Sequence, residues 1–390
     1  MSDNTRTVQA SFFILIALTG GLAILSSTMS KTPVLPLFAA SLGATPAEIG
    51  WIVIASTIPG ILVSFPAGAL SDFLGHRRVL IASLVIFATA PFLYLFVDSA
   101  WQLMAVRFYH GFATAIFGTV ASAAIAGHYG ADRAARLSAY SSVTIVGRSV
   151  APFLGGALIS MASFGAVYIA CAVSGVLALA AGMFLRDTAP RMKHKPEMPH
   201  FWKSMVAVLQ DRGIMLVSLV EAAQYLVFGA VEAFLALYAA SLGIPAWQIG
   251  VILGVQLVSI VFMKPLMGRV SDRVGRKRVI VPGLLVGAAS VVLLPCLPNF
   301  IGLAALSLVF GLGFATVTSS TAALVADLTK DGRFGSSMGV LRTVMDVGQS
   351  IGPVLTGWMV AIAGYGEAFT LLAAILAGAA IMIGAGLRAR

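Results

Sequence analysis

The chain has 390 residues, of which 59% are hydrophobic and only 10% are charged, and its formal net charge is +10. Soluble globular proteins carry about 25% charged residues, so this composition excludes a water-soluble enzyme. The 40 glycines and 16 prolines fit helices that pack closely inside a membrane, where small residues let helix backbones approach each other. The predicted fold class is therefore an all-α membrane protein.

Twelve apolar segments follow one another along the chain, each about as long as the roughly 20 residues that a spanning helix needs. Only short loops separate them, except for one charged stretch in the middle, so no large soluble domain is expected. The predicted spans are 10–39, 48–70, 78–97, 100–126, 137–161, 164–185, 213–240, 247–270, 278–296, 299–327, 336–363 and 367–387.

The basic residues lie almost entirely on one side of the predicted membrane. The termini and the loops on their side hold 20 of the 25 Lys and Arg residues, and the opposite loops hold none. Positively charged loops mark the cytoplasmic side, which places both termini and the 186–212 loop in the cytoplasm. We expect a multi-pass protein of the plasma (inner) membrane, surrounded by lipid. The excess of basic over acidic residues reflects this topology, so no nucleic-acid partner is expected.

An internal repeat divides the chain into two similar halves. A shift of 200 residues aligns SLGATPAEIGWIV, from Ser41, with SLGIPAWQIGVIL, from Ser241. The same shift aligns GALSDFLGHRRV, from Gly68, with GRVSDRVGRKRV, from Gly268. Repeats of the same orientation are typical of transporters that hold a site between their halves.

The repeat predicts twelve transmembrane helices in two pseudo-symmetric six-helix bundles. We assign residues 1–188 to an N-terminal bundle, 189–212 to a cytoplasmic linker loop and 213–390 to a C-terminal bundle. This arrangement favours a transporter over a receptor or a structural protein.

The loop after the second helix resembles the signature loop of the major facilitator superfamily, and its copy after the eighth helix fits that signature better. A carboxylate beside several cations, between tight turns at glycines, suits a cytoplasmic latch that holds one access state. Alternatively, Arg77 and Arg78 serve only to set the topology. The candidate residues of the two loops are Gly68, Asp72, Gly75, Arg77, Arg78, Gly268, Asp272, Gly275, Arg276 and Arg278.

Two further motifs carry the resemblance. Arg107-Phe-Tyr-His110-Gly111, in the fourth helix, is similar to the superfamily's Arg-x-x-Gln-Gly element. The fifth helix reads GRSVAPFLGG from Gly147, which resembles a motif of the twelve-helix drug:proton antiporters. Glycine and proline there permit close helix packing and a bend, which we expect at the interface between the halves. The packing candidates in both halves are Gly147, Pro152, Gly155, Gly156, Gly348, Gly352, Pro353 and Gly357.

Five basic residues fall inside predicted spans, where each would cost roughly 2.5 to 3.5 kcal/mol at a helix centre, so we expect them to face a wet cavity or a partner. The seventh helix also carries polar and aromatic residues at three- and four-residue steps, a stripe that suits an amphipathic substrate. The five basic residues are Lys31, Arg107, Arg148, Lys264 and Arg342. Candidates for the substrate cavity are Lys31, Arg148, Gln224, Tyr225, Phe228, Glu232, Gln256, Arg342 and Gln349.

Two pairs of buried charges have competing interpretations. Lys31 and Glu232 are near-equivalent in the two halves, and they either pair to close the extracellular side or extend separately to the outer surface. Arg342 and Asp346 share a helix face with Gln349, and they either contribute to transport or form an i,i+4 salt bridge without a transport role.

Proton coupling needs a carboxylate or an imidazole whose proton affinity is tuned by burial and by nearby charge. The candidates are Asp346, Glu232, Glu221, Arg107 and His110. The resemblance to drug:proton antiporters implies a role in proton handling for Arg107. For His110, simple packing beside Gly111 is the alternative.

The function predicted from these features is proton-coupled efflux of small amphipathic or drug-like organic compounds by alternating access. The alternative is an organic-anion or nutrient carrier that uses Lys31, Arg148 and Lys264 to bind its substrate. A non-transporting sensor or lipid-handling protein is a third possibility. No Gly-Lys pair of an ATP-binding P-loop occurs, and no metal-ligand spacing of His or Cys is present. We therefore expect that the protein is not an enzyme and that it needs no metal or cofactor. We expect a proton gradient as its energy source, and a monomer.

Overall fold

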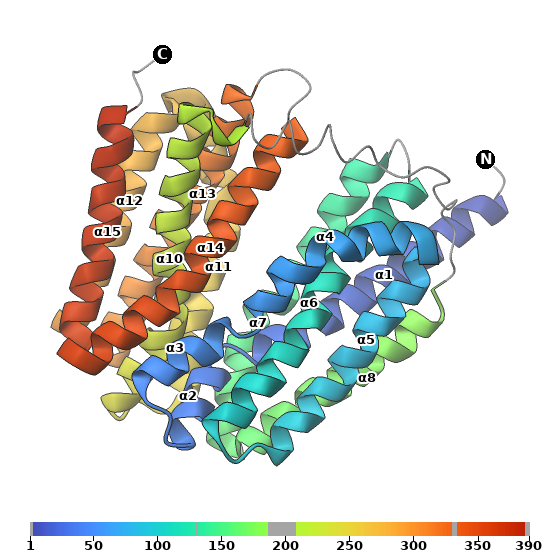
Figure 1. Ribbon diagram of the computed structural model, residues 1–390, viewed down its shortest axis with the longest axis horizontal. Coiled ribbons are helices and arrows are strands. Elements are labelled where there is room, and N and C mark those ends of the chain that lie inside the picture. Colours follow the sequence, from blue (N-terminus) through green and yellow to red (C-terminus); the bar gives the residue numbers. More distant parts are fainter. Residues whose placement is uncertain (1–2, 130–131, 186–207, 330–333, 387–390) are drawn as a thin grey trace. The chain divides into compact units, whose positions relative to one another are not determined.

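The structure is a computed structural model, and it describes residues 3–129, 132–185, 208–329 and 334–386. Throughout these residues the regular elements are α-helices and short 3-10 helices, which confirms the predicted all-α fold class. Figure 1 shows long helices lying side by side in bundles. The side chains of residues 3–10, 61, 64–70 and 72 are not described.

The helices of the first half begin with a long helix that is followed by four shorter ones. In chain order they are α1 (Asp3–Met29), α2 (Val34–Ser41), α3 (Pro46–Ile54), α4 (Thr57–Leu74), α5 (His76–Leu93), η1 (Tyr94–Phe96), α6 (Ala100–Tyr129), α7 (Arg133–Met161) and α8 (Phe164–Met183).

The helices of the second half repeat this order at a shift of about 200 residues. They are α10 (Arg212–Ser241), α11 (Ala246–Val274), α12 (Arg276–Val292), η3 (Leu294–Cys296), α13 (Phe300–Leu328), α14 (Phe334–Ala363) and α15 (Tyr365–Gly386). Even the 3-10 turns η1 and η3 recur 200 residues apart, so the repeat in the sequence is also a repeat of structure.

The chain separates into two compact units. The first comprises Met1–Ala44 and Trp51–Lys195, and the second comprises Thr45–Gly50 and Pro196–Arg390. Within the first unit α1 packs on α7 and α8, and α6 packs on α4 and α5; within the second, α10 packs on α14 and α13 packs on α11 and α12. Most of the predicted linker lies outside the described residues, so its predicted limits remain a prediction.

Ten helices in the described part of the chain are long and apolar enough to span a bilayer. The predicted spans 48–70 and 336–363 are not among them. The second of these corresponds to α14, which carries Arg342, Asp346 and Gln349 near its middle, and these polar residues lower its mean hydropathy. The ten spans establish a multi-pass membrane protein, while the count of twelve remains a prediction.

The predicted span 48–70 is divided in the structure by a turn at Ala55 and Ser56 that separates α3 from α4. Pro59 explains this turn, because proline has no N–H to bond to the carbonyl four residues earlier, and its ring clashes with that carbonyl. The matching residue of the second half is Ser259, and α11 runs through it without interruption. The first predicted span is divided similarly, at Pro33, between α1 and α2.

The two signature loops contain a glycine that the backbone requires. Gly75 joins α4 to α5 with φ +90°, and Gly275 joins α11 to α12 with φ +101°. Side chains other than glycine are strained at such positive φ values. The chain therefore turns sharply at the same place in both halves.

Close packing of α14 on α10 depends on two glycines of the predicted packing motif. A Cβ atom added at Gly348 or Gly352 would lie under 3.0 Å from the backbone carbonyl of Ala222 or Leu226, respectively. In the first unit, Gly147 of α7 faces the carbonyl of Gly21 in α1. These glycines thus bring together helices of the same unit.

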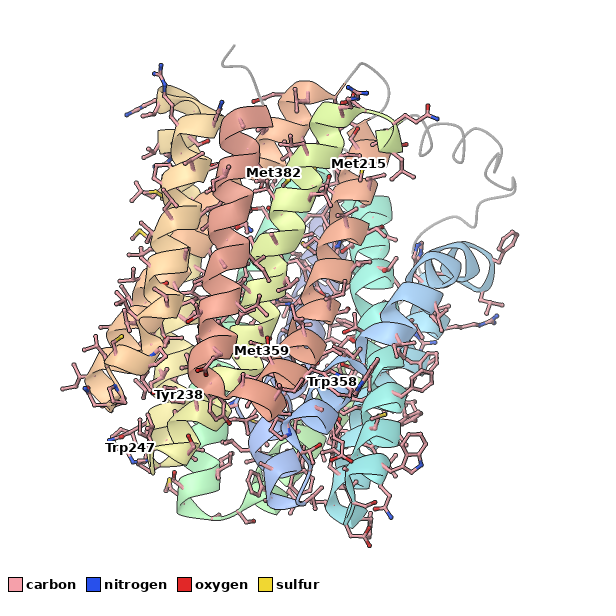
Figure 2. All side chains as sticks on the ribbon, turned by 60° about the vertical axis from the view of Figure 1, so that its left-hand side comes forward. Met215, Tyr238, Trp247, Trp358, Met359 and Met382 are labelled. Atoms are coloured by element: carbon pink, nitrogen blue, oxygen red, sulfur yellow. The ribbon has the colours of Figure 1, made fainter. Side chains whose placement is uncertain are left out.

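Aromatic side chains gather toward one end of the second unit. Figure 2 shows Tyr238 and Trp247 near this end, and Met215 and Met382 toward the other. Trp247 and Trp358 are about half exposed, at 46% and 52%. Trp and Tyr are enriched where a spanning helix meets the membrane surface, which agrees with the helix end that Trp247 occupies.

Candidate functional site

The first unit contains a buried arginine held by neutral groups. Arg107 of α6 is only 3% exposed, and its Nη2 donates a hydrogen bond to Ser56 Oγ at 2.6 Å. Its Nη1 donates to the Tyr94 hydroxyl at 3.4 Å. The α3–α4 turn supplies Ser56 and the η1 turn supplies Tyr94, so two breaks in regular helix provide the partners of this charge.

His110 lies one helical turn after Arg107 and joins the same cluster. Its Nδ1 is 3.3 Å from the Tyr94 hydroxyl, and its ring packs edge-on against Phe87. The residue is 2% exposed, and its Nε2 has no hydrogen-bond partner among the residues that the structure describes. Next to it, Gly111 lies directly against the backbone of Ser56, where a Cβ atom would collide with the carbonyl. His110 therefore has both the predicted packing surroundings and a polar contact.

The second unit contains a buried carboxylate. Glu221 of α10 is 3% exposed, and Thr321 of α13 donates a hydrogen bond to its Oε2. The Lys264 ammonium of α11 is near enough to act on Glu221 electrostatically. Three helices of one unit thus bring together an acid, a hydroxyl and a cation.

The predicted stripe on the seventh helix continues from Glu221 into an aromatic cluster. Phe314 of α13 packs against Phe228, with ring centroids 4.5 Å apart, and against Tyr225, with centroids 5.0 Å apart. Gln224 lies between Glu221 and Phe228 on the same face of α10 and is fully buried. These stripe residues therefore face other helices of the second unit, where polar and aromatic groups adjoin.

Gln256 occupies the place in the second unit that Ser56 occupies in the first. The carbonyl of Gln256 faces Gly311 of α13, as the carbonyl of Ser56 faces Gly111 of α6. Gln256 is 1% exposed, and its side-chain Oε1 has no hydrogen-bond partner in the part of the chain that the structure describes. The residue that corresponds to Arg107 is Ser307, so the buried arginine has no charged counterpart at the matching position of the second half.

The other charged candidates are less buried. Lys31, between α1 and α2, is partly buried in the first unit, whereas Arg148 of α7 is exposed, and Glu232 of α10 is partly buried in the second unit. Lys31 and Glu232 thus belong to different units, and their pairing remains a prediction.

On α14, Arg342 is exposed, whereas Asp346 and Gln349 are partly buried. The Arg342 guanidinium is near enough to act on Asp346 electrostatically. Both interpretations of this pair, a role in transport and an i,i+4 salt bridge, therefore remain predictions. The carbonyl of Gln349 lies against Gly229 of α10.

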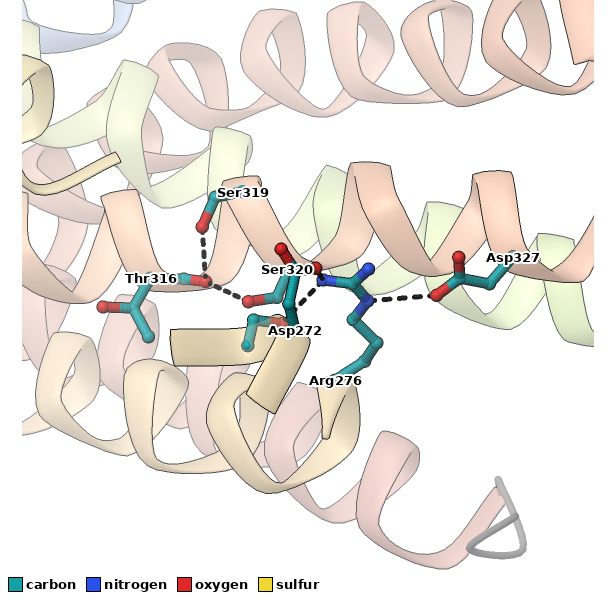
Figure 3. A network of polar contacts seen from close by, with 7 residues as sticks. Asp272, Arg276, Thr316, Ser319, Ser320 and Asp327 are labelled. Carbon is teal, nitrogen blue, oxygen red and sulfur yellow. Dashed lines mark hydrogen bonds and ion pairs between the residues drawn. The ribbon is translucent and has the colours of Figure 1, made fainter. Parts of the chain in front are cut away.

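The second signature loop forms an ion-pair network, which Figure 3 shows. Arg276 pairs with Asp272 four residues earlier, and its Nε donates to Asp327 Oδ2 of α13 at 3.0 Å. This network links the start of α12 to the end of α13. In the first loop, Arg77 Nη2 donates to the carbonyl of Met183 at the end of α8. The side chain of Asp72 lies outside the described part of the chain.

Sequence reasoning did not single out Ser56, Tyr94 or Thr321. The partner of Glu221 is 100 residues away in the chain, and no local pattern indicates such a contact. Ser56 had a usable signal, because it matches the candidate Gln256 at the 200-residue shift. In the described residues, no group of three or more His, Cys, Asp or Glu side chains is arranged to hold a metal ion.

Spanning helices with charged groups buried inside each of two repeated bundles define a polytopic membrane protein of the transporter class. The model of the Major Facilitator Superfamily matches residues 16–255 and 217–390. The chain belongs to the Major Facilitator Superfamily, whose members are transporters rather than enzymes.

Known proteins resemble the chain over different lengths. An uncharacterized MFS-type transporter of Methanocaldococcus jannaschii is 23% identical over 85% of this chain and 87% of its own length. The multidrug transporter MdfA of Yersinia pestis is 26% identical over 44% of each chain. The cephamycin export protein CmcT of Amycolatopsis lactamdurans is 28% identical over 42% of this chain and 34% of its own.

A solved structure has the same fold. The crystal structure of the nucleoside transporter NupG, a D323A mutant, superposes with a TM-score of 0.86 and 14% sequence identity. It covers 97% of this chain and 100% of that one. This likeness establishes the fold, and it extends over both halves.

Proposed function

We propose that the protein is a secondary active transporter that exports small amphipathic or drug-like organic compounds in exchange for protons. The observation that carries this proposal is the buried Glu221, bonded to Thr321 and beside an aromatic cluster in the same unit. A buried carboxylate that is ionised in one state and protonated in another carries a proton across the membrane. The partial likeness to a multidrug transporter and to an export protein supports the outward direction.

Glu221 is preferred over the other acidic candidates because of its burial. Asp346 and Glu232 are only partly buried, whereas Glu221 is almost completely removed from solvent. A hydroxyl that donates to a buried carboxylate stabilises its charged form, while burial favours its neutral form, and a group under both influences is suited to bind and release a proton. The substrate cavity candidates remain Lys31, Arg148, Gln224, Tyr225, Phe228, Glu232, Gln256, Arg342 and Gln349.

The proposal includes a location and a topology. The protein lies in the plasma (inner) membrane with both termini in the cytoplasm, takes its energy from the proton gradient and acts as a monomer without a cofactor. The distribution of basic residues supports this orientation.

A direct test uses the purified protein in liposomes that carry a pH gradient and a pH-sensitive dye in the lumen. Organic cations, neutral amphipathic compounds and organic anions are added in turn. Compounds that are substrates will dissipate the gradient, and Glu221→Gln will abolish this proton movement because the amide cannot ionise. Glu367→Gln, at an exposed residue that opens α15, is the matched control and will retain it.

Asp346→Asn and Glu232→Gln extend the test to the remaining carboxylates. If Glu221→Gln moves protons as fast as the unaltered protein while one of these two variants does not, the coupling role belongs to that other residue. If no compound moves protons in the unaltered protein, antiport is excluded.

A second candidate function is uptake or exchange of an organic anion. It is favoured by Arg107, a nearly fully buried cation whose hydrogen-bond partners, Ser56 and Tyr94, are both neutral. In this alternative Lys31, Arg148 and Lys264 also bind substrate. Gradient-independent accumulation of organic anions, with protection of these three basic residues from chemical modification by substrate, would favour the second function over the first.

A further inference from the structure

The interface of α10 and α13 contains two buried side chains with unused hydrogen-bonding capacity. Gln224 is 0% exposed, and neither its Nε2 nor its Oε1 has a hydrogen-bond partner among the described residues. Thr318 is 1% exposed, and its hydroxyl also has no partner in this part of the chain. Leaving such a group unsatisfied is unfavourable, so native proteins rarely retain one without a reason.

The contacts between the two helices place these residues at one level. Glu221 meets Thr321 at one end of the interface, and Phe228 meets Phe314 at the other. Gln224 lies between the first members of these pairs, and Thr318 lies between the second members. Because each residue advances a helix by about 1.5 Å, both lie about 5 Å from the level of Glu221.

Thr318 differs from the other hydroxyl residues around it. The Thr316 hydroxyl bonds to the carbonyl of Leu312 in its own helix. The Ser319 and Ser320 hydroxyls both bond to the carbonyl of Thr316, as Figure 3 shows. Buried helical Ser and Thr residues commonly satisfy themselves in this way. The Thr318 hydroxyl makes no such bond, so it is available to a group outside the helix.

The side-chain amide of Gln224 offers a donor and an acceptor side by side, and Thr318 adds a hydroxyl that both donates and accepts. This pattern matches the edge of another amide, which offers an acceptor and a donor in the complementary order. Phe228, Phe314 and Tyr225 adjoin it, and Tyr225 is partly exposed. Aromatic rings suit a planar ligand, which stacks on them or meets them edge to face.

We infer that Gln224 and Thr318, with the adjoining aromatic cluster, form a subsite for the neutral amide edge of a planar ligand such as an aromatic carboxamide or a lactam. The inference rests on the proposed function, because it names the class of organic compound that the transporter takes. Glu221 belongs to proton coupling, and the amide subsite selects the substrate one helical turn away. The test must distinguish binding of such a ligand from occupation of the same place by an ordered water.

The test compares ligands that differ only in the amide group. The purified full-length protein in detergent, without any gradient, is titrated with 2-naphthamide and with 2-acetonaphthone, in which a methyl group replaces the amide nitrogen. Tryptophan fluorescence reports binding. We expect the amide to bind at least about 10-fold tighter, since a site built to hydrogen-bond a ligand rejects an analogue that leaves its groups unpaired.

Substitutions assign this preference to the two residues. Gln224→Leu and Gln224→Met will reduce the ratio of the two affinities to about 1, and Thr318→Val will reduce it partly, while ketone binding changes less than about 3-fold. The matched controls, Gln248→Leu in the first turn of α11 and Thr316→Val in α13, will retain the ratio. Melting temperatures of all variants identify any that misfold, and the two Gln224 variants provide independent readings.

The subsite is excluded if the unaltered protein does not bind the amide or binds both probes equally. It is also excluded if Gln224→Met lowers the affinity for both probes by the same factor. Equal binding is the result expected if only water occupies the site. Because binding is measured without a gradient, it is independent of proton coupling. An amide preference without proton movement would exclude antiport and leave the subsite, and proton movement without the preference would exclude only the subsite.

Discussion

At the scale of single residues, the clearest asymmetry between the two halves is in their buried charges. The first unit buries Arg107 among neutral oxygens, and the second buries Glu221 beside a hydroxyl. The two units therefore differ in chemistry at a level where they agree closely in backbone structure. One repeat holds a buried cation, and the other holds the buried carboxylate that we propose for proton coupling.

Arg107 is expected to be sensitive to replacement by lysine. A guanidinium reaches Ser56 and Tyr94 with two different nitrogens, whereas one ammonium at the end of a flexible chain does not reproduce this fork. A hydrogen bond to a charged group contributes about 1.5 to 3 kcal/mol, so Arg107→Lys should slow transport by about 10- to 100-fold in liposomes.

The matched control for this prediction is Arg212→Lys at the exposed start of α10, which should transport normally. Ser56→Ala removes one of the two partners and should have an intermediate effect. Equal transport rates for Arg107→Lys and the unaltered protein would contradict the bridging role.

At the scale of the helices, glycine packing holds α14 on α10. Gly352→Ala places a methyl group against the carbonyl of Leu226, and overpacking of this kind costs about 1 to 3 kcal/mol. We therefore expect a lower midpoint of thermal denaturation. Gly378→Ala, in α15 with no atom within 4 Å of the added methyl group, should match or exceed the stability of the unaltered protein, since alanine is a better helix former.

The two glycines of the second signature loop should respond differently to the same change. Gly275 has φ +101°, where an alanine would cost about 1 to 3 kcal/mol of strain. Gly268 is inside α11 with open space around it, so Gly268→Ala should be tolerated. Denaturation midpoints of the two variants check this difference, and equal destabilisation would show that the turn does not require glycine.

Helix positions were largely predictable from the sequence, because a spanning helix must be apolar for about 20 residues. The turn at Ser56 was not predicted, because one proline in an apolar run gives no sure sign of whether a helix bends or stops. The polar stripe on α10 was visible at three- and four-residue steps, but its partners Thr321 and Phe314 were not. Contacts between distant helices depend on packing, which a single sequence does not contain.

At the scale of the whole molecule, the distribution of basic residues predicts which surfaces face the cytoplasm. In a Cys296→Ala background, where the remaining Cys171 is buried, Glu367→Cys at the start of α15 should react with a membrane-impermeant maleimide added to intact cells. Arg273→Cys at the end of α11 should react only after the cells are opened. The reverse pattern of labelling would invert the proposed topology.

Residues 45–50 belong by packing to the second unit, although the chain on either side of them belongs to the first. Gly50 lies against the carbonyl of Pro353, and Gly357 lies against the carbonyl of Pro46. The second unit thus includes a short segment from the first half of the sequence, and the second half of the sequence alone lacks this segment. The two halves can be produced as separate polypeptides divided at the central loop. We expect the second polypeptide to fold completely only when the first is present, because the first contributes residues 45–50.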